Sequence, residues 1–412
     1  MLGSLRDRVV LLHGWRANLL ALTAGAITAL GLAPFHIWPI VFVTFPLLVW
    51  LLDGAVPLAR RDGRRPGVLA RVWPAFQTGW WFGFGYFLAG LWWIGRAFLV
   101  EADTFLWLLP IAVVALPAGL ALFWGLACSL ARAAWIDIGW RAPLRLFALA
   151  AALGGAEWLR GTVLTGFPWN LVGYVAMPSP VAMQSAALIG AYGVTALTVL
   201  AACLPALLAE RRAAWIALPG LALLVGGHIG YGIWTLGQAS DETVDGVQLR
   251  IVQPAIAQDE KWIGDNEDAI MARYLEGSNA NTGPRSASVA AFTHIIWPES
   301  AFPFILTQRP DRLAEIGALL PEGTQLITGG MRVEDAVGEG EPRVFNALYL
   351  LDDRGTIRSA ADKTRLVPFG EYLPARDWLS ALGLRRLVPG NGGFVPGNRR
   401  AAMRVPGAPA LL

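Results

Sequence analysis

The first 236 residues are dominated by long apolar stretches, and this feature limits the possible folds more than any other. A membrane-spanning helix needs about 20 mostly apolar residues. The first stretch is not a cleaved signal peptide, because no cleavage site follows it and a second apolar stretch begins almost at once. We therefore predict a multi-pass α-helical membrane domain over residues 1–236. It contains seven candidate spans: 15–33, 35–52, 74–95, 105–131, 144–160, 181–209 and 213–236.

The composition changes where these stretches end. Residues 1–236 carry 23 charged side chains, whereas the shorter segment 237–412 carries 40. Sixteen of the 19 tryptophans lie in the first segment. Over the whole chain 15% of residues are charged, against about 25% in soluble proteins. We therefore predict that residues 237–412 form a separate domain outside the bilayer.

Arginines orient the predicted spans. One set of connections carries 13 arginines, whereas the opposite set carries only Arg96 and Arg160, beside two acidic residues. Basic residues favour the cytoplasmic side of a membrane. We therefore expect a cytoplasmic N-terminus in the cell inner membrane. Seven crossings then place residues 237–412 outside, in the periplasm of a cell with two membranes.

Two features near the fifth span have alternative explanations. Glu157 and Arg160 lie one helical turn apart, and an acidic residue inside a membrane is a functional candidate. We favour an i,i+3 ion pair whose arginine reaches the membrane interface. The following aromatic segment, residues 166–170 (GFPWN), is explained either by an interfacial aromatic belt or by a lip that binds lipid.

Strand and helix signals alternate in the second segment, which predicts an α/β domain with two packed layers. A turn is expected at Gly329-Gly330 after the third strand, and another at residues 352–355 within a hairpin. Strands are predicted at residues 247–253, 294–297, 325–328, 343–352 and 355–361, and helices at 265–277 and 309–320.

Several classes of chemistry are excluded by the motifs. The sequence contains no nucleophile elbow, no Walker A motif and no dinucleotide-binding fingerprint. Its four histidines have no metal-ligand spacing, and two cysteines cannot form a cysteine-rich zinc module. We therefore predict no metal and no cofactor. A net charge of +3 also argues against a nucleic-acid partner.

Glu299 is the first candidate for a catalytic residue. It follows a buried strand in the sequence IIWPES, at the strand end where α/β sites gather. Burial beside Trp297, Pro298 and Phe302 would raise the pKa of its carboxyl group, as general-base catalysis requires. An exposed glutamate at a strand end is the alternative.

Lysine usage points to a second candidate. Of 33 basic residues only Lys261 and Lys363 are lysine. A compact ammonium can stabilise an oxyanion in a way that a planar guanidinium cannot, so we expect a specific task; chance codon usage is the alternative. Lys363 also opens a stretch rich in turn-forming residues, which carries a second carboxylate at Glu371.

These motifs resemble the apolipoprotein N-acyltransferase family, whose soluble domain is of the nitrilase (carbon–nitrogen hydrolase) type. In the soluble half, the resemblance rests on residues 297–300 (WPES), on 363–372 (KTRLVPFGEY), and on 252–254 with Lys261-Trp262. In the membrane half, it rests on residues 33–39 (APFHIWP) and 159–169 (LRGTVLTGFPW). It therefore covers nearly the whole chain.

The resemblance implies a fold and a site. The fold is a multi-pass helical membrane bundle followed by an extracytoplasmic four-layer αββα domain, and the site is a Glu–Lys–Cys triad. Glu299 corresponds to the general base and Lys363 to the oxyanion-stabilising lysine. Glu371 corresponds to an additional supporting glutamate, and Trp262 to a residue on the substrate side.

The implied reaction is acyl transfer in two steps. A cysteine thiolate takes the sn-1 acyl chain from a phospholipid such as phosphatidylethanolamine. The α-amine of an apolipoprotein's N-terminal diacylglyceryl-cysteine then accepts the chain from the thioester. Both substrates are anchored in a membrane, which agrees with the predicted architecture.

The sequence departs from the family at the nucleophile, because no cysteine follows Cys203. Cys128 and Cys203 lie within predicted membrane helices and are expected to be packing residues. We expect the reading frame to continue past Leu412 to a cysteine and a further transmembrane helix, and the chain as printed to be inactive. The alternatives are a catalytically dead protein that binds lipid or lipoprotein, and a membrane-tethered amidase.

Overall fold

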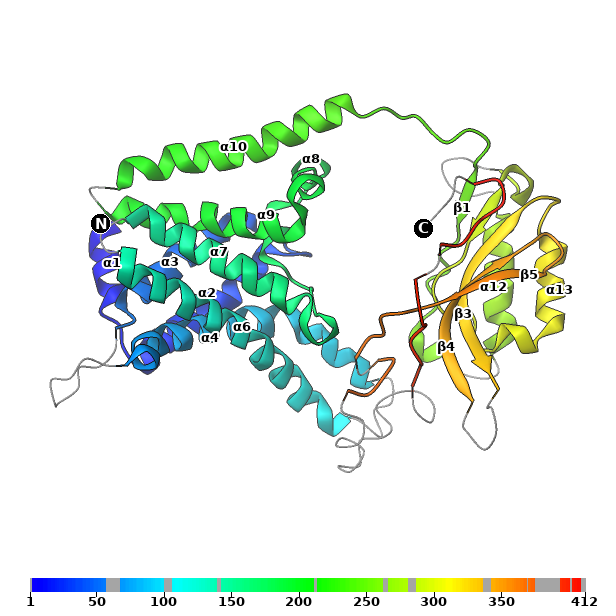
Figure 1. The fold of residues 1–412 in the computed structure, drawn as a ribbon, viewed down its shortest axis with the longest axis horizontal. Coiled ribbons are helices and arrows are strands. Elements are labelled where there is room, and N and C mark those ends of the chain that lie inside the picture. The colour runs from blue at the N-terminus through cyan, green and yellow to red at the C-terminus, as the bar shows by residue number, and fades with distance from the viewer. Residues whose placement is uncertain are drawn as a thin grey trace. The chain divides into compact units, whose positions relative to one another are not determined.

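The computed structural model describes residues 2–56, 67–99, 106–138, 142–210, 213–261, 266–280, 287–335, 342–368, 370–374, 393–400 and 402–408. The chain divides into two compact units, Met1–Ser240 and Asp241–Leu412 (Figure 1).

The first unit is built of helices, and helices occupy part of each of the seven predicted apolar stretches. Among the residues that the structure describes, three segments are long and apolar enough to cross a membrane: Leu106–Trp135, Ser185–Ala209 and Ala214–Gln238. A helical membrane region is therefore supported, whereas the number of crossings stays a prediction. The α-helices are α1 (Leu2–Val10), α2 (Trp15–Thr28), α3 (Val41–Gly54), α4 (Val68–Leu91), α6 (Leu109–Ile138), α7 (Ala142–Arg160), α8 (Pro180–Met183), α9 (Ser185–Cys203) and α10 (Ala214–Gln238).

Glycines allow α2 and α4 to pack backbone against backbone. A Cβ atom at Gly25 would lie 1.9 Å from the carbonyl oxygen of Phe82. A Cβ atom at Gly85 would lie 2.0 Å from the carbonyl oxygen of Leu22. Small residues at such crossings are typical of membrane helices, whose association depends on close packing.

Glu157 and Arg160 pair as expected, but the pair is buried. Arg160 Nη2 lies 2.6 Å from Glu157 Oε2, and both side chains are 0% exposed. Trp124 Nε1 donates a hydrogen bond of 2.8 Å to the same carboxylate, and Arg160 Nη1 donates one of 2.9 Å to the carbonyl oxygen of Trp169. The prediction that Arg160 reaches the interface is therefore wrong. The unit supplies internal partners instead, as a buried charge requires.

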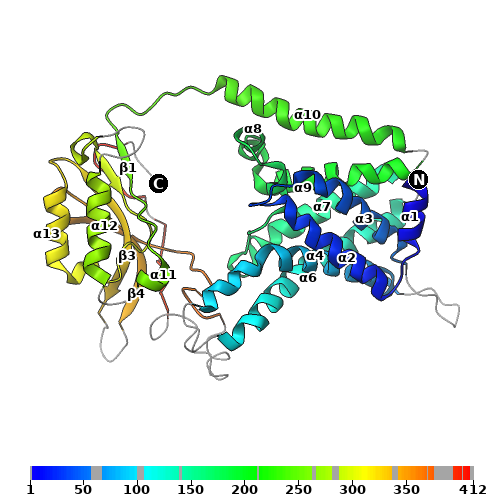
Figure 2. The same cartoon turned by 180° about the vertical axis from the view of Figure 1, so that it is seen from behind.

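The second unit contains a five-stranded mixed sheet with the order β1-β2-β3-β4-β5. The first three strands are parallel, and β4 and β5 continue the sheet as an antiparallel hairpin. Helices α12 (Glu267–Asn279) and α13 (Pro310–Leu319) connect the parallel strands and lie on the same face of the sheet (Figures 1 and 2). The strands are β1 (Leu249–Ile251), β2 (His294–Ile296), β3 (Gln325–Glu334), β4 (Arg343–Leu351) and β5 (Ile357–Asp362).

The mixed sheet agrees with the predicted α/β class, but one predicted turn is wrong. β3 does not end at Gly329-Gly330; it continues because these glycines pair with Leu348 and Ala347 of β4. β1 is also shorter than predicted, because its register with β2 covers only three residue pairs. The longer β3 matters because Gly329 lies against the turn that follows β2.

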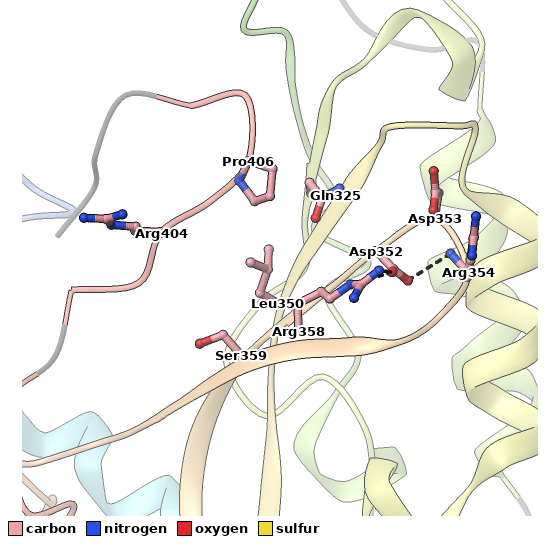
Figure 3. A pocket seen from close by; sticks show the side chains of 9 residues that line it. All are labelled: Gln325, Leu350, Asp352, Asp353, Arg354, Arg358, Ser359, Arg404 and Pro406. Atoms are coloured by element: carbon pink, nitrogen blue, oxygen red, sulfur yellow. Dashed lines mark hydrogen bonds and ion pairs between the residues drawn. The ribbon is translucent and has the colours of Figure 1, made fainter.

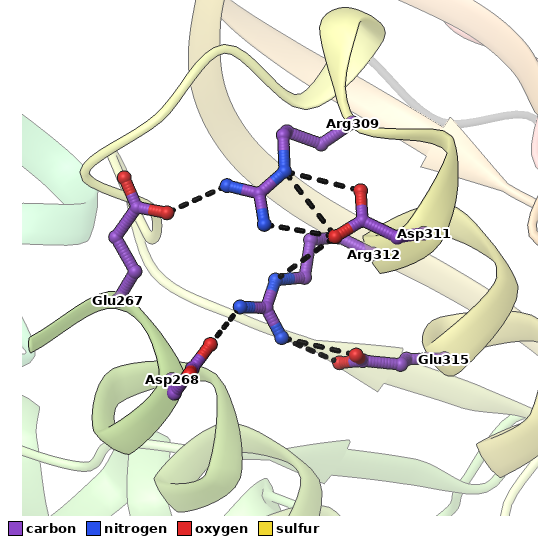
Figure 4. A network of polar contacts seen from close by, with 6 residues as sticks. All are labelled: Glu267, Asp268, Arg309, Asp311, Arg312 and Glu315. Carbon is purple, nitrogen blue, oxygen red and sulfur yellow. Dashed lines mark hydrogen bonds and ion pairs between the residues drawn. The ribbon is translucent and has the colours of Figure 1, made fainter.

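Charged side chains link α12 to the start of α13 on the outside of the sheet (Figure 4). Arg309 lies 2.6 Å from Glu267 and 2.8 Å from Asp311. Arg312 pairs with Asp268 and lies 3.0 Å from Glu315. Several of these carboxylates are well exposed, so the network stabilises the helix pair only modestly.

Candidate active site

Glu299 lies in a turn that packs directly on β3. The N–H of Ala301 donates to the carbonyl oxygen of Gly329 at 2.9 Å, and the N–H of Gly329 donates to that of Pro298 at 3.2 Å. A Cβ atom at Gly329 would lie 2.6 Å from Glu299 Cα. Glycine at position 329 therefore permits the close approach that positions Glu299.

Lys363 follows directly after β5 and is held against β4. Its N–H donates to the carbonyl oxygen of Asn346 at 2.8 Å, and its own carbonyl oxygen accepts a hydrogen bond from the N–H of Gly397 at 2.9 Å. Asn346 lies within β4 and is 5% exposed. The sheet therefore places Lys363 beside the side chain of Asn346.

Glu371 closes its own loop. Its N–H donates to the carbonyl oxygen of Val367 at 2.8 Å, and its Oε2 accepts a hydrogen bond of 2.7 Å from the N–H of Val367. One carboxylate oxygen is therefore used to hold the loop. The other, Oε1, faces Lys363 and Asn346.

These elements bring four side chains together, which we call the carboxylate–lysine cluster: Glu299, Asn346, Lys363 and Glu371. Lys363 Nζ lies 3.0 Å from Oε1 of Glu299 and 3.0 Å from Oε1 of Glu371. Asn346 Nδ2 donates to the same two oxygens, at 2.6 Å and 2.7 Å. Glu371 is 12% exposed at its side chain and Glu299 62%, so Glu299 is the carboxylate that faces solvent.

The charge states differ from the expectation for Glu299. Burial raises the pKa of Glu299, but hydrogen bonds from Lys363 and Asn346 outweigh it, and the net pKa is lowered. The predicted increase is therefore wrong, because it considered only the apolar neighbours in the sequence. Burial lowers the pKa of Lys363, but its hydrogen bonds to Glu299 and Glu371 raise the net value. At neutral pH the cluster thus holds an ionised Glu299 and a protonated Lys363.

This arrangement suits proton transfer beside a stabilised anion. An exposed carboxylate can accept a proton, and a fixed ammonium can stabilise negative charge that develops on a reacting carbonyl oxygen. Lys363 Nζ and Asn346 Nδ2 both donate to the same carboxylate oxygen of Glu299, Oε1.

The structure brings together three of the four residues that the sequence singled out: Glu299, Lys363 and Glu371. Trp262 lies outside the described residues. Asn346 was missed, although a polar residue within the apolar strand VFNALYL was a usable signal. Within the described residues, no group of three or more His, Cys, Asp and Glu side chains is arranged to hold a metal ion.

The two cysteines lie in the first unit, and both are 0% exposed. Cys128 belongs to α6 and Cys203 is the last residue of α9. Neither is in the unit that carries the carboxylate–lysine cluster.

A cavity of about 430 Å³ lies elsewhere in the second unit, beside the turn between β4 and β5 (Figure 3). Asp352 in its wall accepts hydrogen bonds from the N–H of Thr356 at 2.8 Å and from Arg358 Nε at 2.7 Å. None of its lining residues belongs to the carboxylate–lysine cluster. We place the candidate site at the cluster, because the cluster brings an exposed carboxylate next to an ammonium group.

Known proteins match this chain over almost its whole length. The family described as apolipoprotein N-acyltransferase N-terminal domain matches residues 24–204. An apolipoprotein N-acyltransferase of Brucella suis biovar 1 (strain 1330) is 47% identical over 413 residues, covering 98% of this chain and 74% of that protein. The protein of the same name from Rhodopseudomonas palustris (strain ATCC BAA-98 / CGA009) is 43% identical over 418 residues, covering 100% of this chain and 75% of that protein.

A third relative with this name, from Allorhizobium ampelinum (strain ATCC BAA-846 / DSM 112012 / S4), is 46% identical and covers 98% of this chain and 74% of its own length. Such identity spans both the helical unit and the unit with the carboxylate–lysine cluster. The chain belongs to the apolipoprotein N-acyltransferase family.

Proposed function

We propose that this protein N-acylates apolipoproteins by transferring the sn-1 acyl chain of a phospholipid, of the phosphatidylethanolamine type, to the α-amine of an N-terminal diacylglyceryl-cysteine. Family membership supports acyl transfer to lipoproteins in general. The observation that carries the mechanism is the pairing of an exposed, ionised Glu299 with a protonated Lys363.

In the first step, Glu299 takes the proton of a cysteine thiol. The thiolate attacks the acyl carbonyl carbon, and Lys363 stabilises the oxyanion of the tetrahedral intermediate. The ester C–O bond then breaks, and the lysophospholipid leaves with the proton that Glu299 had accepted. The product is a thioester.

In the second step, the α-amine of the apolipoprotein attacks the thioester carbonyl while Glu299 accepts the amine proton. The C–S bond breaks as the amide forms, and Glu299 passes the amine proton to the departing thiolate, which restores the thiol and the ionised carboxylate. Glu371 holds Lys363 in place through both steps by accepting a hydrogen bond from its ammonium. Asn346 holds Glu299 in place by donating to its carboxylate and to that of Glu371. We place Trp262 on the substrate side, as the family resemblance implies.

The nucleophilic thiol is assigned to neither Cys128 nor Cys203, because both are fully buried among the helices of the first unit. The proposal assigns the sheet and its two covering helices to a nitrilase-type αββα sandwich, with the second unit on the periplasmic side of the inner membrane.

The test uses the protein produced from its gene in its own membrane. Glu299→Gln keeps the shape and removes the base, so acyl-enzyme formation from labelled phospholipid should fall by about 10²-fold or more. The double variant Cys128→Ala, Cys203→Ala is the matched control and should retain the acyl-enzyme. If the Glu299→Gln variant forms the labelled acyl-enzyme at the wild-type rate, the proposal is contradicted.

A further inference from the structure

Lys261 is the second of only two lysines, and the proposed mechanism does not use it. It is the last residue of α11 (Gln258–Lys261) and is 7% exposed. Lysine is rarely buried so fully unless its ammonium is paired. In a chain that otherwise uses arginine, a buried lysine points to a role for a compact ammonium.

The ammonium of Lys261 contacts the turn that carries Glu299. Its Nζ donates a hydrogen bond to the carbonyl oxygen of Ser300. Ser300 has a φ of 48°, in the left-handed region that residues other than glycine seldom adopt. Ala301, the next residue, is bonded to Gly329 of β3 at 2.9 Å. α11 therefore holds the turn at Ser300, and β3 holds it at the next residue, Ala301.

The positive charge of Lys261 also acts on Glu299. Among the groups around that carboxylate, Lys363 and Asn346 donate hydrogen bonds to it, and Glu371 shares both donors. Lys261 adds a Coulombic attraction that lowers the pKa of Glu299. Burial lowers the pKa of Lys261, and the charge of Glu299 raises it in return.

We propose that Lys261 is a positioning residue for Glu299: it fixes the backbone turn through Ser300 and holds a positive charge beside the carboxylate. The inference rests on the proposed function only in the role of Glu299 as general base. With Lys261 in place, Glu299 should therefore stay ionised, and able to accept a proton, down to a lower pH than it would with Lys363 and Asn346 alone.

Three substitutions separate the hydrogen bond from the charge. Lys261→Gln keeps an N–H donor that can serve the Ser300 carbonyl but removes the charge. Lys261→Arg keeps the charge with a different shape, and Lys261→Met removes both. Glu260→Gln is the control, because Glu260 belongs to the same short helix but its side chain is 55% exposed.

The measurement is the titration of the Glu299 carboxylate by infrared difference spectroscopy on the protein in lipid bilayers, with Glu299→Gln as the reference. This readout needs no catalytic turnover. The titration midpoint should rise by about 0.5 to 1 pH unit in Lys261→Gln and Lys261→Met, and by less than half of that in Lys261→Arg. Glu260→Gln should leave it unchanged.

The acid limb of the pH profile of kcat/KM for acyl transfer should move in the same direction and by a similar amount in Lys261→Gln. If Lys261→Met does not fold, Lys261→Gln decides the outcome, because it retains the donor. An unchanged midpoint in folded Lys261→Gln would overturn the proposal. A shifted midpoint in a protein without acyl transfer would instead refute the proposed function and leave the role of Lys261 intact.

Discussion

At the scale of single residues, Lys363 is defined by one nitrogen that lies 3.0 Å from each of two carboxylate oxygens. The planar guanidinium of arginine cannot bring a single nitrogen to the position between these two oxygens. Lys363→Arg should therefore lower acyl-enzyme formation by about 10²-fold, although the positive charge is kept. Arg365→Lys, on an exposed residue of the same loop, is the control and should retain activity. The assay is acyl-enzyme formation from labelled phospholipid. If Lys363→Arg forms the acyl-enzyme at the wild-type rate, Lys363 is not part of the active site.

Asn346 is the residue whose role only the folded structure reveals, and it predicts a pH effect. Its amide donates to Oε1 of Glu299, a hydrogen bond that lowers the pKa of Glu299. Asn346→Ala should therefore raise that pKa, so activity that needs ionised Glu299 is lost at a higher pH. We expect the acid limb of the pH profile of kcat/KM to move to higher pH by about one pH unit, so that activity falls most at acidic pH. A uniform loss at all pH values would mean that Asn346 acts only through folding.

At the scale of elements, β3 positions Glu299 through a glycine. Gly329→Ala would place a Cβ atom 2.6 Å from Glu299 Cα, so the turn after β2 must move. We expect a loss of about 1–3 kcal/mol in the free energy of unfolding and a larger loss of acyl transfer. Gly330→Ala is the neighbouring control, because its new Cβ would meet side-chain atoms no nearer than 3.4 Å. Equal behaviour of the two variants in unfolding and activity assays would contradict this account.

The helices of the first unit make a similar prediction. At Gly85 a Cβ atom would lie 2.0 Å from the carbonyl oxygen of Leu22, so Gly85→Ala should force α2 and α4 apart and lower the thermal unfolding temperature in detergent. Gly119→Ala in α6 meets nothing within 4 Å and should be neutral or slightly stabilising. If Gly85→Ala unfolds at the same temperature as Gly119→Ala, the backbone contact between α2 and α4 does not limit stability.

At the scale of the whole molecule, the arginine distribution predicts where the second unit lies. A reporter that is active only in the cytoplasm should be silent when fused after Ser240, at the boundary between the units. The same reporter fused after Gly54, at the end of α3, should be active. A bright signal after Ser240 would mean that the chain crosses the membrane an even number of times before this point, and not the seven times that we predict.

The sequence alone was sufficient for the features that depend on local pattern and composition. Apolar length distinguished the helical unit from the unit that contains the sheet, and periodicity located most strands and helices of the sheet domain within a few residues. Lysine scarcity singled out Lys363 and Lys261 without any knowledge of the fold. These signals are local because secondary structure and membrane insertion depend on neighbouring residues.

Only the tertiary structure decided the features that depend on contacts between distant segments. Asn346 is 47 residues from Glu299 and Lys363 is 64 residues from it, yet both donate hydrogen bonds to its carboxylate. Those donors reverse the direction of the pKa shift that the neighbours of Glu299 in the sequence suggest. The extension of β3 through Gly329 and the burial of Arg160 also depend on contacts between segments that are distant in the sequence. A pattern along the chain does not give the distance between two segments, and hydrogen bonds and charge interactions depend on that distance.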